Sequence, residues 1–489
     1  MKKGLKGIGL LLGIIMLFGS CESWLEVKMK DKILENELYE DLEGYTTALN
    51  GIYAELNNTT IYGAVLSMGT IDVMAQYYDV LTPEAHTMSV YGKYDFNQST
   101  YKSLFSSVWS KMYSLLANIN LLLENCERPD VPLPGVMKGL VTGETYALRG
   151  MLHFDLLRMY GPVYRDNTKN VKVMPYMTEA DRSIRPLLTA EQIINLVIDD
   201  LEKAAVLLGE SDPVIEKGAK NGSLPEDVNN NLNYRQYRLN YYAVQALLAR
   251  AYLWAGNQAK AVACATEVIK VSEGAEAWFP FVGKSEVLKP DDPDRIFSTE
   301  VLFALYNTSR ENLYKSYFQE TQSDASRLTL FGTYNEGRLR TLFPDENDTR
   351  FSLWESSLMD TVEVLYCKKF EDVKEPKYQY MIPLIRTSEM YLLLAECSDS
   401  DQEATDYINK IRYARGCRNI AVTPENKEQL IREEFTREMM GEGQLFIYYK
   451  RKGMESIPSG QSADAYMDMP LINYVWILPD EEIENRYNE

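Results

Sequence analysis

The chain contains 489 residues, of which 45% are hydrophobic and 25% charged, and its formal net charge at pH 7 is −20. So negative a chain is repelled by nucleic acid and by anionic lipid, which excludes both as binding partners, and it favours neutral over acidic polysaccharides. The length is sufficient for a large buried core and, taken alone, allows two or three domains.

The first twenty residues have the pattern of a secretory signal. Three lysines precede an apolar run at 7–18, which is shorter than the roughly 20 residues that a membrane-spanning helix requires. Two small residues then lead to Cys21, a pattern similar to a lipobox, although Phe18 stands where leucine is usual. We predict that residues 1–20 are removed and that acyl chains on Cys21 hold the protein at a membrane. A conventional signal peptide followed by a chance cysteine is the alternative.

Helical periodicity marks the next part of the chain. A less regular helix candidate lies at 101–125, and apolar residues recur close to every 3.6 residues at 137–160. Gly161-Pro162 ends that second helix. Thr189, followed three residues later by Gln192, forms a capping-box pattern and predicts the start of another helix.

Residues 240–270 carry the most informative pattern, because small residues recur there as in a tetratricopeptide (TPR) repeat. A shorter pair of the same kind is predicted at 387–415, and a further helix is predicted to start near Thr423-Pro424, with the proline at its first position. One helical pair cannot bury its own apolar face, so several pairs must stack. The predicted fold class is mainly α: a TPR-like scaffold with long irregular loops and a few short strands.

Two segments lack helical periodicity. Residues 57–100 are rich in Tyr, Thr, Ser, Asn and Gly, and residues 271–385 mix short β-branched runs, such as 300–307, with Pro, Asp and Gly. Long irregular insertions on a rigid scaffold are commonly where ligands bind. We therefore expect the binding site in these two segments.

The same segments resemble the SusD/RagB family over nearly the whole chain after the signal. The closest likeness is GETYALRGMLHFDLLRMYGPV at 143–163. In the segment 433–453, Gln444 and Ile447 stand where the family has arginine and aspartate. The other segments similar to family motifs, in the same order as in the family, lie at 21–56, 108–126, 246–257 and 476–486.

The resemblance implies a single domain over 21–489 with about four TPR units. It also implies a lipid-anchored position on the surface of the outer membrane, oligosaccharide or polysaccharide ligands, and partnership with a SusC-like TonB-dependent transporter to which the ligand is delivered. Two other interpretations remain open. One is a TPR-type surface lipoprotein that binds protein or peptide, and the other is a cryptic glycosidase.

The residues offer little for catalysis. Of the two histidines, His153 is expected to pack within its helix and His86 to be solvated in a polar loop. Residues 283–285 end like a phosphate-binding loop, but Trp278 replaces the required first glycine. No catalytic residue, and hence no enzyme, is predicted, although a glycosidase carboxylate pair needs no sequence signature.

Metal and cofactor motifs are also missing from the sequence. The acidic runs at 291–294 and 345–348 lack the glycine and terminal glutamate of an EF-hand loop, so solvated acidic turns are expected, with a bound calcium ion as the alternative. Five cysteines remain besides Cys21, without a Cys-x-x-Cys pair, and Cys264 is expected to be a buried small hydrophobic residue. We predict no metal and no cofactor.

A glycan site needs flat aromatic faces for the C–H faces of sugar rings and polar side chains for their hydroxyls. The resemblance places such aromatics in the early loop and the central insertion. For any single aromatic residue, packing in the core is the alternative. The candidates are Tyr77, Tyr78, Tyr94, Tyr314 and Tyr317, with Asp72, Asn97 and Gln319 as polar groups.

Overall fold

The computed structural model describes residues 37–83, 85–181, 183–219, 232–331, 338–359, 362–373 and 378–486. The predicted signal at 1–20 and the predicted acylation site Cys21 lie outside these residues. None of the helices in the described ranges combines the length and apolar character needed to cross a bilayer.

Helices dominate the described chain, which confirms the predicted mainly α fold class. The longer helices are α3 (Leu42–Leu56), α6 (Ser99–Cys126), α7 (Gly135–Tyr160), α8 (Ala190–Ser211), α10 (Tyr241–Trp254), α11 (Gln258–Lys270), α13 (Arg310–Tyr317), α15 (Thr387–Cys397), α16 (Asp401–Ala414), α17 (Lys427–Glu438) and α18 (Leu445–Lys452). The shorter ones are α4 (Thr70–Met74), α5 (Ser89–Gly92), α9 (Val214–Lys217), α12 (Lys284–Val287), α14 (Arg338–Leu342) and α19 (Asp480–Arg486). Single turns of 3₁₀ helix are η2 (Arg235–Tyr237), η3 (Ser298–Glu300), η4 (Thr349–Leu353) and η5 (Leu471–Tyr474).

The strands are short and form small antiparallel sheets. The pairs are β1 (Lys172–Met174) with β2 (Leu188–Thr189), β3 (Val301–Tyr306) with β7 (Met381–Arg386), and β8 (Ser456–Pro458) with β9 (Tyr466–Asp468). A three-stranded sheet has the order β4 (Thr329–Phe331), β6 (Val362–Cys367), β5 (Trp354–Met359).

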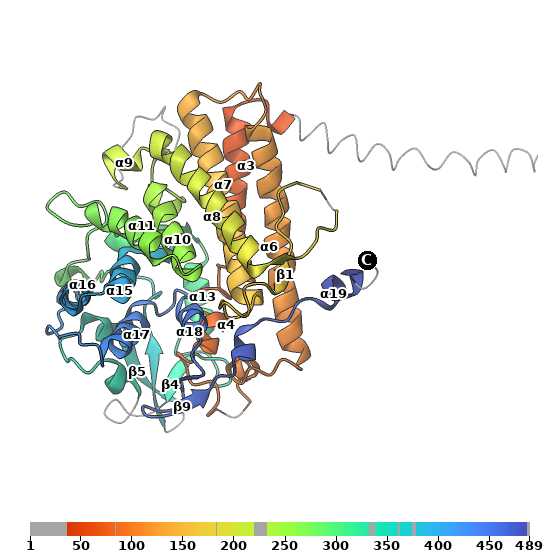
Figure 1. The fold of residues 1–489 in the computed structure, drawn as a ribbon. Helices are drawn as coiled ribbons and strands as arrows, with labels where there is room; N and C mark the ends of the chain where they lie inside the picture. Colours follow the sequence, from red (N-terminus) through yellow and green to blue (C-terminus); the bar gives the residue numbers. More distant parts are fainter. Residues whose placement is uncertain are drawn as a thin grey trace, which may run out of the picture.

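The long helices pack on one another in chain order and form a helical stack. Helix α3 lies against α6, α6 against α7, α7 against α8, α8 against α10, α10 against α11, α11 against α15, and α15 against both α16 and α17. Figure 1 shows α3, α6, α7 and α8 as long upright helices, with β4, β5 and β9 at the lower end of the molecule. The stack contains the helices predicted at 101–125, 137–160, 240–270 and 387–415.

Local sequence signals account for most helix ends in the stack. Thr189 accepts a hydrogen bond from the Gln192 amide (3.2 Å) and donates its own amide to the Gln192 side chain (2.9 Å), the predicted capping box. Gly256, between α10 and α11, has φ +82°, a left-handed conformation that favours glycine. The start predicted at Thr423 is wrong by a few residues. The Thr423 amide donates to the Asn426 side chain (2.8 Å), and this turn delays α17 until Lys427.

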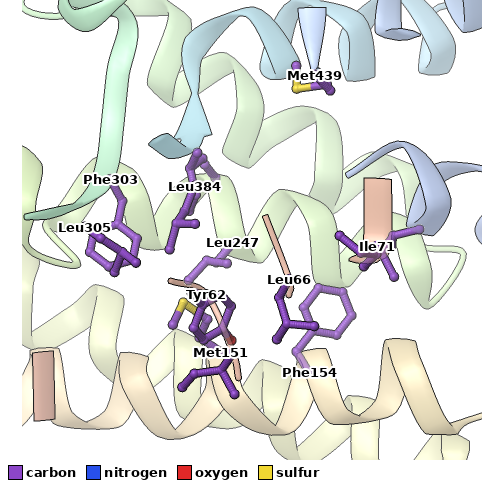
Figure 2. Packing of buried hydrophobic residues seen from close by; sticks show 14 of the residues in the cluster. Tyr62, Leu66, Ile71, Met151, Phe154, Leu247, Phe303, Leu305, Leu384 and Met439 are labelled. Carbon is purple, nitrogen blue, oxygen red and sulfur yellow. The ribbon is translucent and has the colours of Figure 1, made fainter. Parts of the chain in front are cut away.

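The segment 57–100 is irregular, as predicted, but much of it is core rather than surface loop. Residues from Ile61 to Val80 are almost entirely buried. Figure 2 shows Tyr62 and Leu66 packed among side chains of α7 and α10, close to Leu384 of β7. The helical stack alone leaves apolar surface uncovered, and this segment buries it.

A buried ionic cluster joins the stack to the central insertion. Arg415, just after α16, donates to both carboxylate oxygens of Glu300 and of Glu438 at 2.7–2.8 Å. Arg386 donates to Glu438 (3.0 Å) and to Glu442 (2.7 Å). Burial by itself raises the pKa of the Glu438 carboxyl, but Arg415 and Arg386 outweigh it and hold the pKa well below its ordinary value. The Glu438 carboxylate is therefore ionised and paired with both arginines.

Candidate binding surface

The two segments predicted to carry the site do meet. Backbone hydrogen bonds join the Asp79 amide to the Thr329 carbonyl (2.9 Å) and the Thr87 amide to the Ala325 carbonyl (2.7 Å). We call the surface formed by residues 81–83, 85–97 and 317–328 the junction surface. Its two halves are more than 200 residues apart in the chain and are held together by main-chain contacts.

His86 links these halves, contrary to the prediction that it is solvated. Its ring is buried, its Nδ1 accepts from the Met88 amide (3.1 Å), and its Nε2 lies 3.2 Å from the Arg327 carbonyl. Because Nδ1 accepts, the proton is assigned to Nε2, which donates to that carbonyl. Burial lowers the pKa of His86, so the ring is neutral near pH 7. The segment around it is polar in sequence, which hid its burial.

The early segment carries a concentration of unusual backbone conformations. Gln76, Ala85 and Tyr94 have φ values of 61°, 58° and 54° without being glycine. Such residues cost free energy and persist only where neighbouring contacts hold them. The Gln76 side-chain Nε2 donates to the Gly92 carbonyl (3.0 Å), and the Tyr94 hydroxyl donates to the Met74 carbonyl. The junction surface is therefore rigidly supported from below.

Most of the predicted aromatic platform lies inside the protein. Tyr77 and Tyr78 are 2% and 1% exposed, and Tyr94 and Tyr314 are also buried. The Tyr77 hydroxyl donates to the Thr436 carbonyl (2.8 Å). A ring that stacks on a sugar needs an accessible face, so these four placements correct the prediction: the rings are core.

Asp72 is also buried and does not face a ligand. Its Oδ2 accepts from the Gly441 amide (2.7 Å), which ties α4 to the turn after α17. Burial raises the pKa of this carboxyl well above its ordinary value. The prediction that Asp72 binds sugar hydroxyls is therefore corrected, since its role is to hold two segments together.

Three predicted residues keep accessible atoms on the junction surface. Tyr317 and Gln319 are half-buried and Asn97 is exposed. Tyr317 lies beside Tyr91, whose pKa is raised by burial and further by this neighbouring phenol. Their role in ligand binding remains a prediction.

Two features of this region were missed from the sequence. The β8–β9 hairpin packs on the early segment, with the Gly460 amide 3.5 Å from the Gln76 side-chain oxygen, and it carries Tyr466, which is 59% exposed. The polar, turn-rich run at 459–465 was the available signal for such a hairpin.

The second feature missed from the sequence is Arg327. Its buried guanidinium lies over the Tyr366 ring (4.5 Å) and leaves Nη2 without a hydrogen-bond partner among the described residues.

The acidic runs serve the fold. Asp294 accepts a hydrogen bond from Ser298, and Asp348 pairs with Arg350 at 2.7 Å. Both side chains were expected to be solvated, but both are buried. Asp345 is buried and accepts from the Arg418 amide (2.8 Å). Within the described ranges, no three His, Cys, Asp or Glu side chains are grouped so as to hold a metal ion.

The other predicted packing roles are mostly as expected. His153 is buried in α7, stacked on Tyr176 with ring centroids 3.7 Å apart, and its Nε2 accepts from the Met177 amide (2.9 Å). Burial lowers its pKa to about 3. Cys264, expected to be buried, is only half-buried at the edge of the core, because it lies on the outer side of α11.

Two family profiles match the chain. Residues 24–253 match the family described as "Starch-binding associating with outer membrane", and residues 355–466 match the "SusD family". Two curated relatives from Formosa agariphila are similar to parts of it. SusD-like protein P38 is 26% identical over 209 residues (41% of this chain, 38% of the relative), and SusD-like protein P25 is 23% identical over 220 residues (43% and 39%). The chain thus spans about two fifths of these relatives' length.

Solved structures share the fold over nearly the full chain. A SusD superfamily protein from Bacteroides thetaiotaomicron has a TM-score of 0.71 at 23% identity, covering 92% of this chain and 98% of its own. A "putative sugar binding protein" from Bacteroides vulgatus has a TM-score of 0.68 at 22% identity (91% and 96%). A "laminarin binding SusD-like protein" has a TM-score of 0.60 at 17% identity (91% and 98%).

The two family profiles cover different parts of the chain, and both name the same family. One of the two descriptions names starch binding, and members of the family are glycan-binding proteins rather than enzymes. The solved relatives have the same helical architecture. This chain therefore belongs to the SusD/RagB family.

Proposed function

We propose that this protein is a glycan-binding lipoprotein of the outer membrane, not an enzyme, which captures oligosaccharides and delivers them to a SusC-like TonB-dependent transporter. The family description, starch binding in association with the outer membrane, supports this proposal. So does the laminarin-binding name of a protein with the same fold.

The observation that carries the proposal is the junction surface. Two segments distant in sequence are fastened by main-chain hydrogen bonds and by the neutral His86, above strained but well-held backbone. A weakly bound ligand such as a sugar chain requires a surface that is already ordered, because ordering loops on binding would consume its affinity. The junction surface meets that requirement.

The accessible groups on this surface suit a neutral saccharide. Tyr317 offers part of a ring, while Gln319 and Asn97 offer amides that both donate and accept hydrogen bonds. Below them, the free N–H of Arg327 is a donor that a ligand hydroxyl would satisfy after a small side-chain movement. With a net charge of −20, the protein favours neutral over acidic glycans.

Peptide binding among the central helices of the stack, one form of the alternative interpretation, has little space. The cavity between α7, α10, α15, α17 and α18 has a volume of only about 50 Å³, and Trp254, Leu393 and Tyr448 line it. A bound peptide in an extended groove needs far more room than this.

Calorimetric titration with oligosaccharides tests the proposal. The full chain carrying Cys21→Ala, which removes the predicted acylation site, is titrated with maltoheptaose and laminariheptaose, and with a panel of peptides. We expect binding of a glucan, and the double variant Tyr317→Ala/Gln319→Ala should weaken it about tenfold. Tyr306→Ala, another exposed tyrosine outside the junction surface, is the matched control. Binding of peptides but not of glycans would overturn the proposal.

The anchor is tested separately. We propose that residues 1–20 are cleaved, that Cys21 is acylated, and that 21–489 forms a single domain of about four TPR-like units. Cys21→Ala should abolish incorporation of labelled palmitate and release the protein from the membrane fraction. Retention of label in that variant would contradict the assignment of Cys21.

A further inference from the structure

A hollow larger than the cavity among the central helices lies on another part of the protein, formed by residues outside the junction surface. Helix α16 and the segment 281–284 border an open hollow with a volume of about 1130 Å³, which is large enough for several sugar rings. We call this hollow the α16 groove. Its walls include Phe281, Lys284, Asp406, Asn409, Tyr413 and Asn419.

One wall is the outward face of α16. The spacing of Asp406, Lys410 and Tyr413 places them on one side of the helix, opposite the buried Ile408 and Ile411. Tyr413 is 82% exposed, more than any other large hydrophobic side chain in the described chain. A tyrosine ring left in water at the wall of a hollow is a flat face available for a ligand.

Three side chains around the groove have no partner in the described protein. The Tyr413 hydroxyl, the Asn419 amide and the Lys284 ammonium make no hydrogen bond or ion pair with any described residue. By contrast, the neighbouring Lys410 pairs with Glu273 at 2.6 Å. The free groups together offer donors, acceptors and an aromatic face.

The floor of the groove is rigid. The Asn409 amide group donates to the Ile420 carbonyl (2.8 Å) and accepts from the Ile420 amide (2.9 Å), which pins the turn after α16 to the helix. Gly416 has φ +77°, and a Cβ there would lie 2.9 Å from the Asn347 carbonyl oxygen, so the backbone conformation and this close approach both favour glycine. The groove is therefore formed before any ligand arrives.

The charges restrict what the groove can hold. Asp406 and the acidic protein as a whole repel phosphates and other strong anions, while Lys284 and Lys410 repel cations. The apolar lining residues, which include Phe281, Val282 and Tyr413, are interrupted by Lys284, Asp406 and Asn409, a pattern that suits a sugar chain better than a hydrophobic helix or a lipid. A neutral polyhydroxylated chain remains, since its hydroxyls can both accept from Lys284 and Asn419 and donate to Asp406.

We propose that the α16 groove is a second saccharide-binding site, where the ring of Tyr413 stacks on a sugar and Lys284 and Asn419 bind its hydroxyls. The inference rests on the proposed glycan-binding function and adds a second contact for the same polymer. Two sites on one protein raise the effective affinity for a long chain that reaches both.

The test is the stoichiometry of binding to the full Cys21→Ala chain. Titration with laminariheptaose and maltoheptaose should give two sites per molecule for one of them. Tyr413→Ala should remove one site, Lys284→Ala and Asn419→Ala should each weaken that site roughly five- to tenfold, and Tyr413→Phe, which keeps the ring, should preserve it. Tyr413 is exposed, so thermal unfolding should be unchanged in these variants.

The outcomes separate the two proposals. If Tyr413→Ala retains both sites with unchanged affinity, or if the wild type has a single site that Tyr317→Ala removes, the α16 groove is not a saccharide site and the proposed function stands. If the wild type binds neither glucan, the proposed glycan-binding function fails and the groove fails with it.

Discussion

The helical stack and the irregular segment 61–80 are both well buried, but they are held in different ways. A helix in the stack satisfies its own backbone and ends at local signals such as Thr189 or Gly256. The irregular segment depends on partners far away in the chain, including Gly441 for Asp72 and Thr436 for Tyr77. The segment 61–80 is therefore not a surface loop despite its irregular backbone, and its aromatic side chains are core.

This comparison predicts that removing a long-range partner costs more stability than removing a local one. The largest effect is expected for Arg415→Met. The change removes the cation that pairs with both oxygens of Glu300 and of Glu438 and leaves Arg386 as the cation they share. Removing one partner from such a buried ionic cluster costs about 4 kcal/mol of unfolding free energy. Denaturant titration measures it. Arg128→Met, which removes an exposed pair with Asp130, is the control and should leave the midpoint unchanged. Equal stability of Arg415→Met and wild type would show that packing alone holds the insertion.

The second prediction contrasts a core tyrosine with a surface one. Tyr77→Ala should lower the unfolding free energy by about 3 kcal/mol, because it leaves a cavity and frees the Thr436 carbonyl. Tyr77→Phe should lose only the hydrogen bond, about 1 kcal/mol. Tyr413→Ala, at an exposed ring, should change neither the midpoint nor the slope of denaturation. If Tyr77→Ala were as mild as Tyr413→Ala, the early segment would not belong to the core.

The third prediction concerns pH. Burial depresses the pKa of His153 from 6.5 to about 3, so the unfolded chain takes up a proton in a range where the folded protein does not. Stability is then full above the unfolded pKa and falls as pH drops below it, by about 2 kcal/mol between pH 8 and pH 5. His86, whose pKa is also lowered by burial, should contribute in the same direction. Measuring stability against pH for wild type and His153→Gln checks this, and the variant should show a shallower acid loss.

The smallest effect is expected for a local signal in the stack. Thr189→Ala removes the side-chain half of the capping box of α8 and should cost about 1 kcal/mol. Thr189→Ser, which keeps the hydroxyl, should restore most of it. A loss as large as that of Arg415→Met would break the distinction between local and long-range support.

Much of the fold could be predicted because helices are encoded locally. Periodicity located the helices at 137–160 and 240–270 to within a few residues. The start near Thr423 was wrong because a threonine followed by proline fits a turn as well as a cap.

Gln444 and Ile447 stand where the family has arginine and aspartate. Both lie beside Arg158, which donates a hydrogen bond to the Gln444 side chain at 3.1 Å. Losing one cation and one anion together leaves the buried charge balanced.

The candidate site was less predictable. Of the predicted residues, Tyr317, Gln319 and Asn97 keep accessible atoms, but the sequence could not separate them from Tyr77, Tyr78 and Tyr94, which are buried. In an irregular backbone no fixed period relates position to side-chain direction. Exposure is then decided by packing against distant residues.

By itself, the sequence determined the helical pairs, the net negative charge and the membership of the family, because periodicity, composition and ordered motifs are properties of the linear chain. Only the tertiary structure decided which tyrosines are exposed, that His86 is a buried link, and that Tyr413 lines a groove with free polar groups. These depend on contacts between segments hundreds of residues apart, and burial is a property of the packed whole.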